Sequence, residues 1–140
     1  MKLYVTTTSP YARLAMIAMH DKGLSAEVEL VWTQTRQPND PLLAVNPSGR
    51  IPFLLLVDGS GMEDTDLIVD YFDALLPPRR YGVPDGENHW PSRRLEAMAR
   101  SMLDGGSVWA REIKRPIDEQ SPELIEHERR RALRLADYFE

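Results

Sequence analysis

The sequence predicts an α+β domain with a small mixed sheet, followed by a helical segment. Three observations support this prediction. Residues 1–76 alternate between strand-like and helix-like patterns in the order β-α-β-(α)-β-β-α. Residues 77–91 contain four prolines and two glycines and have no period, so they resemble a linker. Beyond them, two long amphipathic patterns predict helices.

The first half of the domain begins with a short strand and a capped helix. Leu3-Tyr4-Val5 is apolar enough for a strand. Ser9-Pro10 supplies an N-cap hydroxyl followed by proline at the first helical position. The helix is expected to end near Gly23, since a glycine suits the left-handed conformation after a helix. Residues 28–32 alternate in polarity and predict a half-buried second strand.

The stretch between the two halves of the domain has a weaker pattern. Residues 33–40 are polar and have no period, and residues 41–45 fit at most a short or irregular helix. The turn residues 46–49 then lead into the apolar run 51–57, which predicts a strand. Proline at position 52 is tolerated because the first residue of a strand needs no ladder donor.

A hairpin and a helix complete the domain. Asp58-Gly59-Ser60-Gly61 predicts a tight turn, so the preceding run should pair antiparallel with a short strand around Met62. A helical period begins at Asp64, and Pro77-Pro78 ends it. We therefore assign a domain to residues 1–78 and a linker to residues 79–90.

Residues 91–140 predict the start of an all-helical domain. One helix should begin at Pro91-Ser92 and continue past Gly105-Gly106, where a close helix contact or a bend is expected. A second helix should begin at Ser121-Pro122 and carry its apolar stripe to Phe139. Two helices cannot cover both stripes, so we expect either a subunit that covers them or a natural protein longer than this sequence, and we favour the second.

The composition excludes several classes of function. The chain has no cysteine, which excludes disulfides, thiolate metal sites and a thiol nucleophile of its own. A formal charge of −5 argues against nucleic-acid binding, and the basic run Arg129–Arg131 stands among glutamates, as on a solvated helix face. No signal peptide or membrane span is predicted, so a cytoplasmic location is expected.

Three short motifs resemble one family in order and in register. Ser9-Pro10-Tyr11-Ala12 resembles the active-site turn of glutaredoxins with both cysteines replaced. Asn46-Pro47-Ser48-Gly49-Arg50-Ile51-Pro52 matches the turn N-P-x-G-[KR]-[IV]-P, and Asp64-Thr65 stands where an acidic residue and a serine begin the next helix. The chain therefore resembles the bacterial serine-type glutathione transferases, in which a thioredoxin-like domain precedes an all-helical domain.

The resemblance implies that the protein binds glutathione through its first domain. Ser9 would donate a hydrogen bond to the glutathione sulfur, and the positive end of the helix would favour the thiolate. A plain N-cap is an equally good interpretation of Ser9, and the two roles are compatible. Thr8 is the second candidate for the thiol contact.

The other site residues also come from the resemblance. It implies a cis peptide bond before Pro52, with the Ile51 main chain pairing with the cysteinyl amide of glutathione; without it, a trans proline that starts an edge strand would be expected. Arg50 would reach the glycyl carboxylate, or else be a solvated arginine. Asp64 would take the γ-glutamyl ammonium and Thr65 the carboxylate, or both would only cap the helix.

The expected activity is attack of the glutathione thiolate on a small apolar electrophile, with glutathione as co-substrate and no metal or tightly bound cofactor. The alternatives are a non-catalytic binding or stress-regulatory protein, and a glutathione-dependent isomerase or dehalogenase. Thiol–disulfide exchange on the protein itself is excluded because it needs a cysteine. No nucleic-acid or membrane partner is expected, whereas the resemblance implies a homodimer.

Overall fold

The computed structural model describes residues 1–140, and three of its helical segments begin where a capping side chain precedes a proline. Ser9, Asp40 and Ser121 each accept a hydrogen bond from a backbone N–H in the first turn. The proline that follows has no N–H, and none is needed there. In chain order the elements are β1 (Lys2–Val5), α1 (Pro10–Asp21), β2 (Glu29–Trp32), the 3-10 helix η1 (Pro41–Ala44), β3 (Phe53–Leu55), β4 (Gly61–Glu63), α2 (Thr65–Leu75), the 3-10 helix η2 (Gly86–Asn88), α3 (His89–Glu112), the 3-10 helix η3 (Ile117–Glu119) and α4 (Pro122–Phe139).

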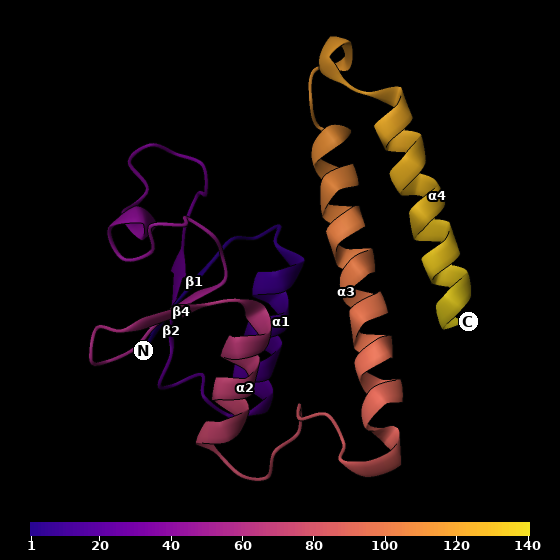
Figure 1. The fold of residues 1–140 in the computed structure, drawn as a ribbon. Helices are drawn as coiled ribbons and strands as arrows, with labels where there is room; N and C mark the ends of the chain where they lie inside the picture. The colour runs from indigo at the N-terminus through magenta and orange to yellow at the C-terminus, as the bar shows by residue number, and fades with distance from the viewer. The chain divides into compact units, whose positions relative to one another are not determined.

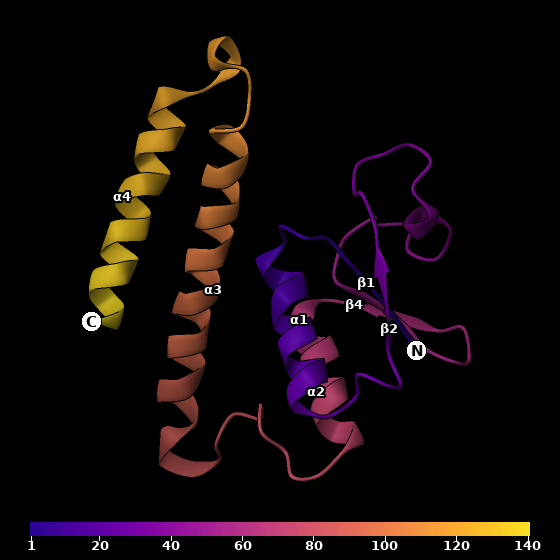
Figure 2. The ribbon, with the colours of Figure 1, turned by 180° about the vertical axis from the view of Figure 1, so that it is seen from behind.

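The chain divides into two units, Met1–Gly82 and Val83–Glu140. In the first unit the strands form one four-stranded sheet in the order β2-β1-β3-β4. Strand β1 is parallel to β2 and antiparallel to β3, and β3 is antiparallel to β4. Figures 1 and 2 show α1 and α2 side by side next to this sheet. The predicted mixed sheet of a βαβ half and a ββα half is confirmed.

Each face of the sheet has its own apolar cluster. On one face Leu3, Val5 and Leu54 pack with α1 and α2 into a cluster from which water is excluded. On the other face Tyr4 and Phe53 pack with Leu42 of η1. Successive residues of a strand point to opposite faces, so the alternation in β1 decides which helices each side of the sheet can bury.

Strands β2 and β3 are shorter than their sequence patterns predicted, and the end of β2 is more exposed. Only Phe53–Leu55 of the predicted strand 51–57 pairs as β3, and Trp32, expected to be half buried, has 55% of its surface exposed. Strand β2 is the outermost strand of the sheet, so it has a neighbouring strand on one side only. Periodicity within a strand does not reveal its place in the sheet, and for this reason the exposure could not be predicted.

The second unit is a hairpin of two long helices, α3 and α4, which lie side by side (Figures 1 and 2). Helix α3 begins at His89, two residues before the predicted start, and continues through both glycines. Gly105 is buried because α4 crosses there: a Cβ at this position would lie 2.5 Å from Glu128 Oε2. The expected close helix contact is therefore present at Gly105.

The interior of this hairpin contains two buried glutamates. Glu112 and Glu128 are buried, and Glu112 Oε1 accepts a hydrogen bond of 2.7 Å from the Ser121 N–H. Arg131 donates to the hydroxyl of Ser101, joining α4 to α3 at 2.8 Å. The apolar stripe predicted for α4 is only partly covered, since Leu135 is buried while Phe139 remains exposed. None of the helices has the length and apolar character needed to cross a membrane.

A buried ion pair joins the C-terminal ends of α1 and α2. Lys22 Nζ lies 3.0 Å from Asp73 Oδ1, and both side chains are almost completely buried. The same ammonium also donates to the carbonyl oxygens of Asp73, Leu76 and Pro78. All charged atoms of the pair are thus hydrogen-bonded, as burial of a charge requires.

The residues after α2 are held to the first unit by the same pair. The Asp73 carboxylate accepts hydrogen bonds from the backbone N–H groups of Arg80 at 2.8 Å and Tyr81 at 3.1 Å. The side chains of Arg80 and Tyr81 both donate to Asp21. Residues 79–82, expected to be linker, therefore pack with the first unit.

Replacing Lys22 by methionine is expected to destabilise the first unit by about 3–5 kcal/mol, because it leaves the Asp73 carboxylate buried without its cation. Lys2→Met is the matched control, since Lys2 pairs with Glu29 at 3.6 Å with both side chains more than half exposed. The control should lose at most about 1 kcal/mol. Urea unfolding followed by circular dichroism measures both, and equal losses would contradict the prediction.

The stability of the first unit should depend on Asp73 in a defined pH range. Burial alone would raise the pKa of Asp73, but hydrogen bonds from the Arg80 N–H and from Lys22 outweigh it, so the pKa is lowered. A carboxyl with a lowered folded pKa contributes stability above its unfolded pKa of about 3.9, and this contribution is lost as the pH falls through the folded value.

We therefore expect the difference in unfolding free energy between the wild type and Asp73→Asn to be constant near neutral pH and to shrink below about pH 4. Urea unfolding at several pH values measures this difference. A difference that does not change on acidification would show that the contribution of Asp73 to the free energy of unfolding does not depend on its charge.

Candidate functional site

The sheet register brings the three predicted binding segments to one edge. Tyr4 of β1 pairs with Phe53, the first residue of β3, and Phe53 also pairs with Glu63, the last residue of β4. The loop after β1, the turn before β3 and the corner after β4 therefore leave the sheet at the same edge. These are the segments that carry Ser9, Pro52 and Asp64.

Ser9 is the N-cap of α1, and its side chain is partly buried. Its Oγ accepts a hydrogen bond from the Ala12 N–H at 3.2 Å. The hydroxyl donates to no group of the protein, so its proton is available to an outside acceptor. No acidic residue lies in the first turn of α1, so the positive end of the helix is not neutralised there. Thr8, the second candidate for the thiol contact, is exposed next to Ser9.

The turn before β3 has the backbone that the resemblance implied. The Ile51–Pro52 peptide bond is cis, and Gly49 has a φ of 63°, a conformation that suits glycine. Pro52 is buried and Ile51 is half buried. Arg50 is exposed and its guanidinium makes no ion pair within the protein, so the structure leaves it able to meet a carboxylate.

The corner after β4 combines a left-handed residue with a buried hydroxyl. Asp64 has a φ of 82° and caps α2 through a hydrogen bond of 3.0 Å from the Asp66 N–H. Thr65 has only 6% of its surface exposed, yet its hydroxyl has no partner within the protein. Every side-chain oxygen that is fully buried in this structure has a hydrogen-bond partner. Because the Thr65 hydroxyl has none, it must be accessible to solvent. It lies in the first turn of α2, where N–H groups favour an anion, although Asp64 already accepts from one of them and Asp66 adds a second carboxylate.

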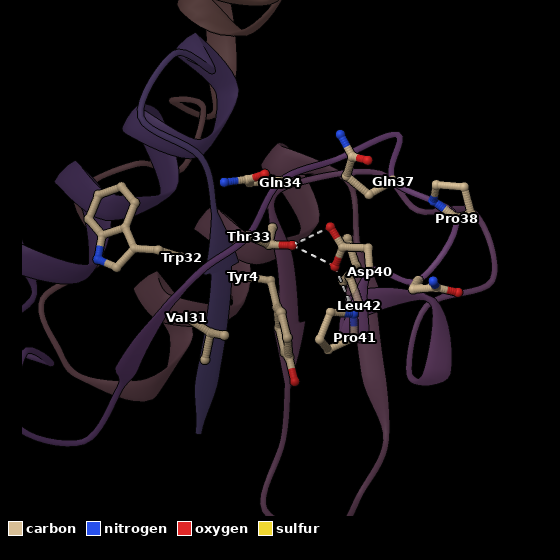
Figure 3. A pocket seen from close by; sticks show the side chains of 11 residues that line it. Tyr4, Val31, Trp32, Thr33, Gln34, Gln37, Pro38, Asp40, Pro41 and Leu42 are labelled. Carbon is tan, nitrogen blue, oxygen red and sulfur yellow. Dashed lines mark hydrogen bonds between the residues drawn. The ribbon is translucent and has the colours of Figure 1, made fainter.

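A cavity that the sequence did not predict lies at the loop after β2. It has a volume of about 340 Å³. The hydroxyl of Thr33 donates to both oxygens of Asp40 at 2.6 Å, and the Leu42 N–H donates to Asp40 at 2.9 Å (Figure 3). The cavity is lined by Tyr4, Val31, Trp32, Thr33, Gln34, Gln37, Pro38, Asn39, Asp40, Pro41 and Leu42.

Asp40 closes this loop on η1. The hydrogen bond from Thr33, followed by that from the Leu42 N–H, lowers the pKa of Asp40. Thr33 continues the pairing of β2, since its N–H donates to the Val5 carbonyl at 3.0 Å, so the loop leaves the sheet at the same edge as the segment of Ser9. The signal for this arrangement was Asp40-Pro41, which has the same cap-and-proline order as Ser9-Pro10.

His20, the one histidine of the first unit, takes no part in the candidate site. His20 Nδ1 lies 2.7 Å from the Ser25 hydroxyl at an exposed position near the end of α1, away from Ser9. No group of three or more histidine, aspartate or glutamate side chains is placed to hold a metal ion. The polar groups at this edge are hydroxyls, helix ends, main-chain groups, the Arg50 guanidinium and the Asp64 carboxylate.

Comparison with known families and proteins identifies relatives of this chain. A family model described as glutathione S-transferase, N-terminal domain, matches residues 3–80. The uncharacterized GST-like protein YibF of Escherichia coli is 27% identical over 140 residues, which cover the whole chain and 68% of YibF. Glutathione S-transferase 2 of Saccharomyces cerevisiae is 31% identical over 117 residues, which cover 78% of this chain and 48% of the yeast protein.

A solved structure agrees with these matches. The glutathione S-transferase of Methylobacillus flagellatus, with glutathione bound, superposes with a TM-score of 0.84 and 30% sequence identity. The alignment covers 99% of this chain and 67% of that one. The chain thus spans about two thirds of this structure and of YibF, and about half of the yeast protein.

Proposed function

The chain belongs to the glutathione S-transferase family, and we propose that its first unit binds glutathione and activates the thiol for attack on a small apolar electrophile. The carrying observation is the placement of Ser9. Its hydroxyl keeps an unused proton at the start of α1, at the same sheet edge as the cis-proline turn and the Thr65 corner. The structure of the Methylobacillus flagellatus relative contains bound glutathione, which supports glutathione as the ligand in this proposal.

Ser9 acts on the sulfur of the bound tripeptide. A free cysteine thiol has a pKa near 8.5, so only a few per cent is ionised at neutral pH. A hydrogen bond from the Ser9 hydroxyl and the positive end of α1 both stabilise the thiolate, and the thiol proton passes to solvent. The thiolate then forms a bond to the electrophilic carbon or heteroatom, and the leaving group departs with the electron pair of the broken bond.

The remaining segments hold the two ends of the tripeptide. The Ile51 main chain pairs with the cysteinyl amide, and the unpaired Arg50 guanidinium meets the glycyl carboxylate. The Thr65 hydroxyl and the N–H groups at the start of α2 bind the γ-glutamyl carboxylate. Asp64 offers a carboxylate oxygen to the γ-glutamyl ammonium while its other oxygen caps the helix.

Two rival functions use the same site. A non-catalytic binding or stress-regulatory protein would bind glutathione without lowering its thiol pKa, and a glutathione-dependent isomerase or dehalogenase would lower it and differ in the acceptor. The Ser9 hydroxyl donates its proton to no group of the protein, which favours the catalytic functions over the binding protein. Transferase activity is our first proposal, and identification of the acceptor would separate it from isomerisation or dehalogenation. We further propose that the protein is cytoplasmic and that it forms a homodimer. Exposed apolar side chains on the second unit, such as Ile117, support the homodimer.

The thiol of glutathione bound to the wild type should have a pKa below that of free glutathione, and Ser9→Ala should raise it by about 1–2 units. A hydrogen bond to a charged group contributes about 1.5–3 kcal/mol, and one pKa unit corresponds to 1.36 kcal/mol. The ultraviolet absorbance of the thiolate as a function of pH measures both values.

Ser121→Ala is the matched control, because it removes an N-cap hydroxyl from α4 in the second unit. It should leave the thiol pKa unchanged, while Ser9→Thr should retain most of the lowering. An unchanged thiol pKa in Ser9→Ala, with glutathione still bound, would favour the non-catalytic binding protein.

Thr65→Val should weaken glutathione binding by about ten- to a hundredfold. Valine fills the same volume but lacks the hydroxyl, and the loss of one hydrogen bond to a carboxylate costs about 1.5–3 kcal/mol. Isothermal titration calorimetry with glutathione measures the change. Thr65→Ser should bind like the wild type, and a valine variant of undiminished affinity would remove Thr65 from the site.

A further inference from the structure

A hydrogen-bonded network joins the turn before β3 to the last residue of β4. Glu63 Oε2 accepts hydrogen bonds from Asn46 Nδ2 at 3.3 Å and from the Ser48 hydroxyl. The proposed glutathione site uses Arg50 and Ile51 on one side of these contacts and Asp64 and Thr65 on the other. Glu63 itself has no part in that site.

Inside the turn, the two donors that reach Glu63 also hold Arg50. Asn46 Nδ2 donates to the Arg50 carbonyl at 3.0 Å, and the Arg50 N–H donates to Ser48 Oγ at 3.1 Å. Asn46 Oδ1 accepts from the Ser48 N–H at 3.0 Å, and Asn46 has only 3% of its surface exposed. Both main-chain polar groups of Arg50 therefore depend on side chains that are bound to Glu63.

On its other side, Glu63 is continuous with the corner of α2. It is the last residue of β4 and lies opposite Phe53, and Asp64 and Thr65 follow it directly. A displacement of the turn relative to Glu63 is thus a displacement relative to both residues of the corner. The carboxylate is the only side chain that hydrogen-bonds to Asn46 and Ser48 from outside the turn.

We propose that Glu63 is a positioning residue that sets the spacing between the Arg50–Ile51 turn and the Asp64–Thr65 corner. This role rests on the proposed function, because it matters only for a ligand that spans both segments. A tripeptide held at both ends binds tightly when the two grips are already at the right separation, since no ordering is then required on binding. Hydrogen bonds to a carboxylate are strong enough to fix that separation.

Glu63→Ala should weaken glutathione binding about tenfold in calorimetry, a loss comparable to one charge-assisted hydrogen bond. Glu63→Gln keeps an oxygen that can accept from the same donors, so its affinity should lie between those of the wild type and the alanine variant. Glu27→Ala is the matched control: Glu27 is also exposed, but it precedes β2 and lies at the opposite end of the sheet from Glu63. Its affinity should equal that of the wild type.

Two measurements separate positioning from a general loss of structure. The pKa of the bound glutathione thiol should not change in Glu63→Ala, because Ser9 and α1 are untouched, and hydrogen exchange at the Arg50 amide should become faster. Ser48→Ala should weaken binding in the same direction. The double variant Glu63→Ala/Ser48→Ala should lose less than the sum of the two single losses, since both remove the same contact.

The outcomes distinguish this role from the proposed function. Wild-type protein that gives no heat with millimolar glutathione would overturn both. Wild-type binding with Glu63→Ala within twofold of it would overturn only the role of Glu63, as would equal losses in Glu63→Ala and Glu27→Ala or fully additive losses in the double variant.

Discussion

The pairing of β1 with β3 is the constraint on which the site depends. Because Tyr4 lies opposite Phe53, the end of β1 and the start of β3 meet at one edge, and the β3–β4 hairpin brings Asp64 to the same edge. A slip of one residue would reverse the faces of Leu54 and Phe53 and expose the core. The hydrophobic core and the site are therefore specified by the same register.

The two ends of helices α1 and α2 are built in opposite ways. Their C-terminal ends are closed by Lys22, whose ammonium lies where helix ends carry partial negative charge and donates to three carbonyl oxygens and a carboxylate. Their N-terminal ends lie at the opposite end of the sheet, where the hydroxyl protons of Ser9 and Thr65 are not donated to any group of the protein. The proposed ligand contacts therefore lie at the N-terminal ends, and the Lys22–Asp73 pair at the far end has no part in them.

Local patterns in the sequence predicted the elements well, because their causes are local. A capping side chain followed by a proline correctly predicted the starts of α1 and α4. The family resemblance correctly predicted the cis peptide bond before Pro52. The same local order at Asp40-Pro41 begins η1, within the residues 41–45 that were expected to form at most a short or irregular helix.

Features that depend on distant residues could not be predicted in this way. Lys22 and Asp73 are 51 positions apart, and neither the ion pair nor the exposure of Trp32 on an edge strand is written in any short window. The hydrogen bonds of Glu63 could not be predicted for the same reason, since its partners Asn46 and Ser48 lie 17 and 15 positions earlier, in the turn before β3. Buried charges and long-range polar contacts follow from the fold, and the fold must be known before they can be named.

The proposed site also separates binding from chemistry. Thr65, Arg50 and the Ile51 main chain would contact groups of glutathione that do not change during reaction, so they strengthen ground state and transition state alike. Only Ser9 would touch the atom whose charge changes, and its contribution is felt in the thiol pKa. A chain that kept the first set and lost the proton of Ser9 would remain a glutathione-binding protein, which is why one hydroxyl on α1 decides between an enzyme and a binding module with the same fold.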